Sequence, residues 1–225
     1  MTTTTATLPA GVTPRTRPEM AARAAADIPD GWYVNLGIGI PILISDHVPV
    51  EREVIFHSEN GILGMGPAAT GNAIDPWVVN AAKKHVELHP GGSFFNHSNS
   101  FGMIRGGHLD LCVMGALEVS EKGDLANWTT SANDAAPAVG GAMDLAVGAK
   151  RIWILMDHLT KDGVSKLVRT CSYPVTALGT VSRVYTNLAV LDVTERGFKV
   201  IEIVPGLSFD QLQALTDSPL HQSER

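Results

Sequence analysis

The 225-residue sequence has only two cysteines and no long apolar run. Cys112 and Cys171 lie far apart without the spacing of a zinc site, so we expect both thiols to be reduced. The longest charge-free stretch with an apolar character, residues 31–45, contains a proline and three glycines and is shorter than the ~20 residues of a membrane span. The first basic residues are Arg15 and Arg17, which is the reverse of a secretory signal. We therefore expect a cytoplasmic protein without a transmembrane helix.

Basic residues are scarce as well. The chain has 17 Lys and Arg against 23 Asp and Glu, a net charge of −6, and its basic clusters are only the pairs 83–84 and 150–151. This balance disfavours nucleic acid as a partner, and no membrane surface is expected either. A phosphate-bearing small ligand stays open, because a few local cations or a helix N-terminus can hold phosphate.

Several common motifs are missing. No GxxxxGK[ST], HExxH or GxSxG sequence occurs, which removes the common ATPase, zinc-protease and α/β-hydrolase interpretations. The turn Gly37-Ile38-Gly39 lacks the third glycine of a dinucleotide-binding fingerprint, because Ile42 stands in that position. This turn indicates only a close approach of the backbone to something else.

Two histidines, His85 and His89, are four residues apart and invite a metal-site interpretation. The segment around them alternates polar and apolar residues as a strand does, and strand positions four apart are separated by ~13 Å. Without a bend the two rings could not share one ion. The sequence therefore predicts no metal site.

Apolar runs typical of strands alternate along the chain with helical patterns, which is typical of a layered α/β fold. We expect residues 1–17 to form a loose, threonine-rich tail and residues 18–225 to form a single domain. The expected strands are 32–36, 54–57, 109–114, 152–156, 188–193 and 198–204, and the expected helices begin at Pro18, at Pro41, near Gly141 and at the capping-box pair Ser208 and Gln211.

The segment that follows the strand at 54–57 carries the strongest signal for chemistry. Loops at the carboxyl ends of parallel strands are where α/β proteins place ligands. Asn60-Gly61 imposes a tight turn, which would present Glu59 at an exposed corner. From spacing alone a structural turn is the more common interpretation, and a catalytic carboxylate is the alternative.

The tetrapeptide Ser58-Glu59-Asn60-Gly61 resembles the SENG signature of family I coenzyme A transferases, in their B (β) subunit. The resemblance covers residues 18–220 and departs from the family at Ala82, where glycine is usual. Within the family, residues 153–161, 171–174, 181–186 and 209–213 resemble most the transferases that act on 3-oxoadipate in the breakdown of aromatic compounds. Further matching segments, in chain order, are 34–41 (VNLGIGIP), 103–108 (MIRGGH), 119–128 (VSEKGDLANW) and 140–145 (GGAMDL).

This resemblance implies a three-layer α/β open sheet, like that of sugar-phosphate isomerases, and a catalytic role for Glu59. The glutamate would be the nucleophile, and Asn60 would either orient it or support the turn. Gly140 and Gly141, just before a helix, would offer backbone N–H groups to an oxyanion. The glycines at the two turns, Gly37, Gly39 and Gly61, would make backbone contacts with coenzyme A or the acyl group.

The resemblance also implies a second chain. Fused members of the family are about twice as long, so this chain is expected to pair with an A (α) subunit as a heterodimer or heterotetramer. The implied reaction moves coenzyme A from succinyl-CoA to a 3-oxo acid, with coenzyme A as a substrate and no metal or redox cofactor. Three alternatives stay open: acetoacetate or another short 3-oxo acid as the acceptor, an acyl-CoA hydrolase on the same scaffold, and a scaffold protein without activity.

Overall fold

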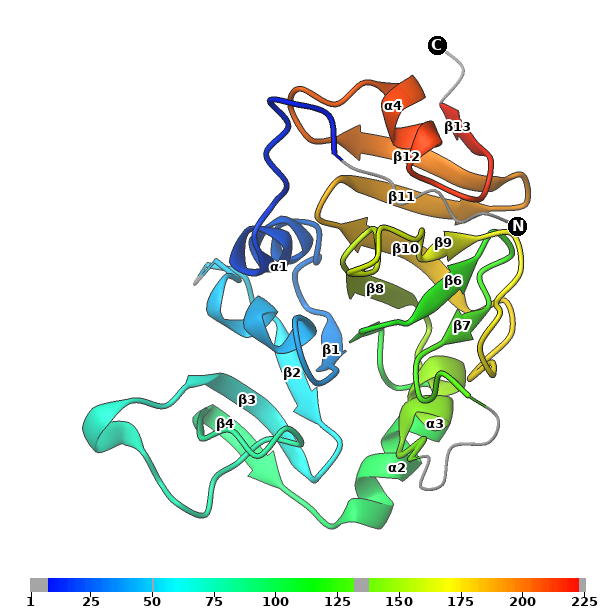
Figure 1. The fold of residues 1–225 in the computed structure, drawn as a ribbon. Helices are drawn as coiled ribbons and strands as arrows, with labels where there is room; N and C mark the ends of the chain where they lie inside the picture. Colours follow the sequence, from blue (N-terminus) through cyan, green and yellow to red (C-terminus); the bar gives the residue numbers. More distant parts are fainter. Residues whose placement is uncertain (1–7, 50, 132–137, 223–225) are drawn as a thin grey trace.

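The computed structural model of the chain describes residues 8–49, 51–131 and 138–222, and a ten-stranded mixed sheet forms its centre (Figure 1). The strands of this sheet are β1 (Tyr33–Leu36), β2 (Ile55–Ser58), β3 (Ile62–Ala68), β4 (Val86–Phe94), β5 (Leu111–Met114), β8 (Ile152–Met156), β10 (Val181–Thr186), β11 (Ala189–Thr194), β12 (Gly197–Ile203) and β13 (Leu220–Gln222). Across the sheet their order is β13-β12-β11-β10-β8-β5-β1-β2-β3-β4.

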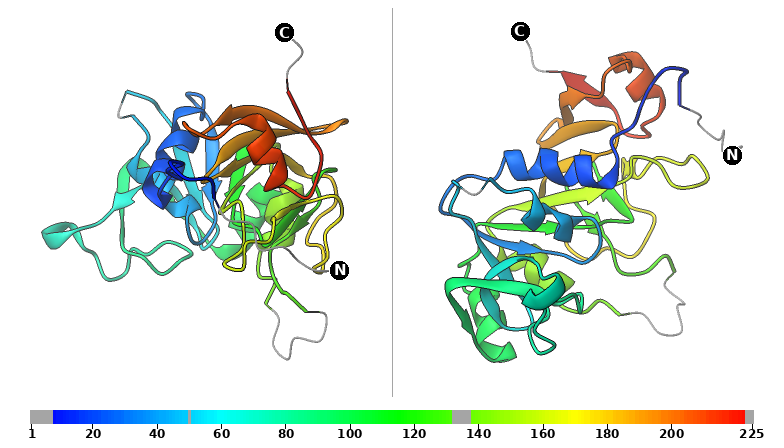
Figure 2. Two further views of the ribbon diagram at one scale, coloured as in Figure 1. Left: turned by 45° about the horizontal axis from the view of Figure 1, so that its top comes forward. Right: turned by 90° about the vertical axis from the view of Figure 1, so that its left-hand side faces the viewer.

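Helices and a second, three-stranded sheet cover the two faces of the central sheet (Figures 1 and 2). One face carries α1 (Arg17–Ala26) and the 3₁₀ helix η1 (Pro41–Asp46). The other face carries α2 (His97–Arg105), α3 (Ala142–Gly148), α4 (Phe209–Ala214) and the small sheet β7 (Leu125–Ala126), β6 (Glu118–Ser120) and β9 (Leu167–Val168). A short 3₁₀ turn, η2 (Gly71–Ala73), lies in the β3–β4 connection.

The core confirms the three-layer arrangement, because successive side chains of one strand enter different clusters. In β8, Ile152, Ile154 and Met156 pack with the α2–α3 side, whereas Trp153 and Leu155 pack with α1. This strand is buried on both faces, as its continuous apolar run predicts.

The strands at the centre of the sheet are parallel, so the loops that follow β1, β2 and β5 all begin at the same end of the sheet, the carboxyl ends of its strands. Strands β10, β8, β5, β1 and β2 run in the same direction. The strand β1 lies between β2 and β5, so the chain after it moves to one side of β1 and later returns on the other. A crevice outside the carboxyl ends of the strands at such a reversal is the usual ligand position in an open α/β sheet.

Sequence patterns predict most of the helix starts. The last helix, α4, has the predicted capping box between Ser208 and Gln211, and α1 begins one residue before Pro18 with a capping box between Thr16 and Glu19. The segment at Pro41, however, forms only the six-residue 3₁₀ helix η1. The sequence patterns do not predict helix α2. Only Ser100 and Ile104 of this helix are buried, so its sequence does not need the periodic apolar residues that mark a helix.

The described part of the expected loose tail is attached to the domain. The Arg15 backbone N–H donates to the Asn187 carbonyl at 2.8 Å, and its guanidinium pairs with Glu202. Loose chain therefore does not extend to residue 17 as predicted, and residues 1–7 lie outside the described part. Both cysteines are free thiols, and no helix among the described residues has the length and apolarity needed to cross a membrane.

Candidate active site

A tight turn at the end of β2 presents the carboxylate of Glu59. The Gly61 N–H donates to the Ser58 carbonyl at 2.9 Å, which closes the turn. Gly61 has a φ of +118°, and a Cβ there would lie 2.1 Å from the Phe95 carbonyl oxygen, so no other residue fits. The Asn60 side chain donates to the Val79 carbonyl at 2.8 Å and so ties the turn to the β3–β4 connection.

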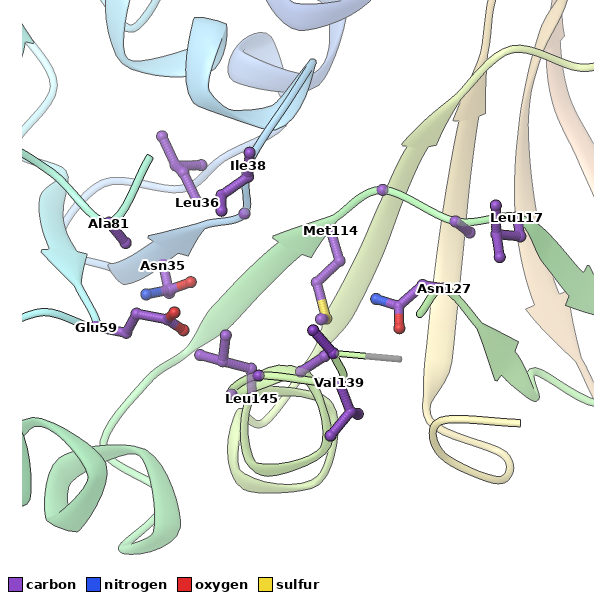
Figure 3. Close-up of a pocket in the computed structure, with 17 residues that line it drawn as sticks. Asn35, Leu36, Ile38, Glu59, Ala81, Met114, Leu117, Asn127, Val139 and Leu145 are labelled. Atoms are coloured by element: carbon purple, nitrogen blue, oxygen red, sulfur yellow. The ribbon is translucent and has the colours of Figure 1, made fainter. Parts of the chain in front are cut away.

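The carboxylate of Glu59 points into a cavity of about 430 Å³, with the Asn35 amide beside it (Figure 3). The cavity lies where the topology predicts, outside the carboxyl ends of β1, β2 and β5. Gly37 lines it from the end of β1 and Met114 from the end of β5, while Asn127 lies on the opposite side from Glu59. It is therefore formed by segments far apart in the sequence.

The predicted pair Gly140 and Gly141 also lines this cavity, next to Glu59. A Cβ built on Gly141 would lie 2.9 Å from Oε2 of Glu59, which shows how closely the backbone approaches the carboxylate. Neither glycine N–H has a hydrogen-bond acceptor in the part of the chain that the structure describes. Two N–H groups that are free to donate beside a carboxylate can stabilise the negative charge that develops on a reacting carbonyl oxygen.

A second cavity, of about 520 Å³, is also lined by Glu59, Gly140 and Gly141. Helix α2 forms its other wall and contributes His97 and Arg105. The nucleophile candidate thus lies where two cavities meet.

Burial and charge act in opposite directions on Glu59. Partial burial raises the pKa of its carboxyl group above the ordinary value, and the positive charge of His97 partly lowers it. A carboxylate that has lost part of its hydration is a stronger nucleophile than a fully solvated one.

The strand that leads to Glu59 is fixed by a buried histidine. His57 is fully buried, with Nδ1 3.0 Å from Nδ2 of Asn35 and Nε2 3.0 Å from Oγ of Ser100. Burial lowers the pKa of His57 to about 4, so the ring is neutral at physiological pH. It therefore links β1, β2 and α2 two residues before Glu59.

The structure brings together four of the residues predicted to act, Glu59, Gly37, Gly140 and Gly141, in one cavity. Gly39 and Gly61 do not line it, and Asn60 contacts the backbone of Val79. The contact roles of these glycines and the catalytic role of Asn60 stay predictions.

Sequence patterns missed three polar groups of the site, Asn35, His97 and Asn127. A signal existed for Asn35, which is a polar residue in an otherwise apolar strand and is buried in the structure. Nothing comparable marks His97, which is exposed at the start of a polar helix.

Comparisons with known proteins identify the family. Residues 18–215 match the family model described as coenzyme A transferase. The chain belongs to the coenzyme A transferase family. It is 57% identical over 204 residues to the B-type chain of the 3-oxoadipate CoA-transferase of Pseudomonas putida, covering 91% of this chain and 95% of that one. It is 42% identical over 202 residues to the B-type chain of the succinyl-CoA:3-ketoacid coenzyme A transferase of Helicobacter pylori, covering 90% and 97%.

A solved structure shares this fold. An acyl-CoA transferase from Escherichia coli O157:H7 superposes with a TM-score of 0.70 at 21% identity. The match covers 96% of this chain but only 43% of the other, so this CoA transferase chain spans less than half the length of that protein. The resemblance drawn from the SENG segment is thus confirmed at the level of family and fold.

Proposed function

We propose that the chain is the catalytic subunit of a 3-oxoacid CoA-transferase that moves coenzyme A from succinyl-CoA to 3-oxoadipate. The observation that carries this proposal is the half-buried Glu59 carboxylate beside the Gly140 and Gly141 backbone. The relative at 57% identity is named for 3-oxoadipate, which supports that acceptor. Acetoacetate or another short 3-oxo acid is the second candidate, because the Helicobacter relative is named for 3-ketoacids.

The reaction begins when a Glu59 oxygen attacks the thioester carbonyl of the donor. The C–S bond breaks, which leaves an acyl-glutamyl anhydride and the CoA thiolate. The thiolate then attacks the glutamyl carbonyl, and the donor acid leaves as a carboxylate. A glutamyl-CoA thioester remains on the enzyme.

The acceptor carboxylate reverses this sequence. One of its oxygens attacks the glutamyl thioester, which gives a new mixed anhydride and free thiolate. The thiolate attacks the acceptor's carbonyl, so the product acyl-CoA leaves and the Glu59 carboxylate is restored. Because the donor acid departs before the acceptor reacts, the kinetics are ping-pong. No step requires a metal or a redox cofactor.

Each attack produces a tetrahedral oxyanion next to Glu59. We expect the N–H groups of Gly140 and Gly141, which have no acceptor among the described residues, to donate to this oxyanion, and a donor of this kind stabilises the transition state by about 3 kcal/mol. The carboxylate is a weak nucleophile, so binding energy from the remote parts of coenzyme A must also be expressed in the transition state.

The proposal includes an A-type partner that completes the substrate site. Its support is that the Pseudomonas and Helicobacter relatives are named as the B-type member of a set of subunits and that the Escherichia coli chain is more than twice as long as the matched part. A heterodimer or heterotetramer in the cytoplasm is the corresponding expectation.

A panel of acceptors tests this function on the assembled enzyme. With succinyl-CoA as donor, we expect a higher kcat/KM for 3-oxoadipate than for acetoacetate. A higher kcat/KM for acetoacetate would be consistent with a CoA-transferase but would overturn 3-oxoadipate as the acceptor. Release of free coenzyme A at the same rate with and without any acceptor would overturn the transferase and indicate a hydrolase.

A further inference from the structure

The two cavities that meet at Glu59 differ in charge. The cavity next to Asn35 and Met114 has no Lys, Arg or His among its described lining residues. The described lining of the cavity against α2 contains two basic side chains, His97 and Arg105, and no acidic one other than Glu59. An anionic part of a substrate therefore has a charge partner on only one side of the nucleophile.

The two basic residues belong to one stripe of α2. His97, Phe101 and Arg105 are spaced four residues apart, which places them on one side of the helix. The His97 ring packs against Phe101 with centroids 4.6 Å apart, and the Arg105 guanidinium carbon lies 5.6 Å from the centroid of the same ring. Phe101 therefore spaces and supports both basic groups along the cavity wall.

The guanidinium of Arg105 is oriented by one hydrogen bond and keeps further N–H groups available. Its Nε donates to Oδ1 of Asp144 in α3 at 2.7 Å, which fixes the plane of the guanidinium. The Arg105 guanidinium makes no other hydrogen bond with the described residues, so its terminal N–H groups are free. A planar, pre-oriented guanidinium with free N–H groups is suited to a carboxylate.

We propose that the α2 cavity binds the free carboxylate of a dicarboxylic acyl group, with Arg105 and His97 as specificity-determining residues. This inference rests on the proposed function and deepens it. Succinyl-CoA and 3-oxoadipate each carry one carboxylate that does not react, and the negative charge of Glu59 would repel that carboxylate unless a basic side chain compensated it. Acetoacetate has no such group and gains nothing from the two basic side chains.

The phosphates of coenzyme A are the other anions that these cations could meet. The whole pantetheine arm separates the phosphates from the thioester, whereas Glu59 itself lines the cavity that contains Arg105. A group in that cavity lies within the reach of the acyl chain. The carboxylate of the acyl group is therefore the favoured ligand.

The test compares two acceptors on the assembled enzyme with succinyl-CoA as the common donor. In ping-pong kinetics the acceptor's kcat/KM reports only the second half-reaction, so a change in donor binding does not affect it. For Arg105→Met we expect kcat/KM to fall about 10- to 100-fold for 3-oxoadipate and less than 3-fold for acetoacetate, since one charge-assisted contact is lost. Arg105→Lys should recover part of the loss, because it keeps the charge but not the planar fork.

Lys150→Met serves as the matched control, because it removes another exposed ion pair, with Asp110 at 2.7 Å, outside both cavities. It should change neither acceptor's kcat/KM. Thermal unfolding of each variant separates loss of fold from loss of binding, and His97→Asn gives a second, independent variant with the same expected selectivity.

Equal losses for both acceptors, together with weaker inhibition by free coenzyme A, would assign Arg105 to the phosphates and overturn the inference. Unchanged kinetics in both the Arg105→Met and His97→Asn variants would also overturn it. A wild-type enzyme that transfers coenzyme A to neither acceptor would instead contradict the proposed function, so the two failures are distinguishable.

Discussion

The backbone of Gly141 approaches Glu59 so closely that a Cβ at that position would lie 2.9 Å from Oε2 of the carboxylate and 2.7 Å from Cζ of Phe101. Both neighbouring atoms are ends of side chains, so they can move aside while the fold is kept. We therefore predict that Gly141→Ala displaces the nucleophile, lowers kcat by about 100-fold and leaves the melting temperature nearly unchanged.

Gly102→Ala is the control for this substitution. Gly102 lies in α2, and a Cβ there would meet nothing within 4 Å. Alanine favours a helix over glycine by about 1 kcal/mol, so this variant should keep full activity and be slightly more stable. If Gly141→Ala retained wild-type kcat, or lost activity only through unfolding, the close approach would have no catalytic role.

The pH dependence of the first half-reaction should report on Glu59. Burial raises the pKa of this carboxyl group and His97 opposes the rise, so kcat/KM for succinyl-CoA should fall with decreasing pH around a midpoint above the ordinary ~4.3 of glutamate. Removing the opposing charge in His97→Asn should move the midpoint to higher pH. An exposed histidine of β4 provides the control His89→Asn, for which we expect no movement. A midpoint that moved to lower pH in His97→Asn would contradict this electrostatic account.

Stability toward acid should depend on two buried histidines outside the reaction itself. Burial lowers the pKa of His57 and of His158 to about 4, against ~6.5 in an unfolded chain. Below pH 6.5 the unfolded chain binds protons that the native chain does not, so stability that is complete at neutral pH is lost as the pH falls toward 4. Each histidine contributes a slope of up to about 1.4 kcal/mol per pH unit.

Urea unfolding of the purified chain between pH 7 and pH 4.5 measures this slope. His158 lies between the hydroxyls of Thr186 and Thr216, and His158→Gln removes one of the two titrating groups. The slope should then fall by up to about 1.4 kcal/mol per pH unit, whatever the absolute stability of the variant. An unchanged slope would show that His158 does not link folding to protons.

The sequence predicted the parts of the fold in which local pattern and tertiary environment agree. The run of apolar residues at 152–156 has no polar face and forms the buried strand β8 with those bounds. The turn at Asn60-Gly61 forms as expected, but it presents Glu59 half-buried in a cavity and not at an exposed corner, because residues from β1, β5 and the segment before α3 surround the carboxylate. The family resemblance predicts Gly140 and Gly141 close to Glu59, and in the structure all three line one cavity.

The wall formed by α2 could not be predicted in the same way. Its sequence is polar, contains Gly102 and buries only two residues, so no apolar period indicates a helix. Asn35 and His57 form their hydrogen bond only because β1 and β2 are neighbours in the sheet, which is a tertiary relationship. The charge difference between the two cavities depends on such contacts and is invisible in the sequence.

The transferase activity of the chain should depend on assembly with an A-type partner. We predict that the purified chain alone has almost no transferase activity and that mixing it with an A-type partner restores activity, since part of the site is expected from the partner. The measurement is kcat against added partner, with the stoichiometry read from the breakpoint and from light scattering. Full turnover by the single chain would contradict the two-subunit proposal.

Glu59 should become covalently linked to coenzyme A during the reaction. The assembled enzyme is incubated with succinyl-CoA and no acceptor, treated with borohydride or hydroxylamine, digested and analysed by mass spectrometry. We predict that the peptide containing Glu59 carries the alcohol or the hydroxamate. Glu59→Gln should abolish the adduct and nearly all turnover while the protein still folds, because an amide removes a charge that partial burial disfavours. An adduct on another residue, or full turnover by a Glu59→Gln enzyme verified to be free of deamidation, would contradict the account.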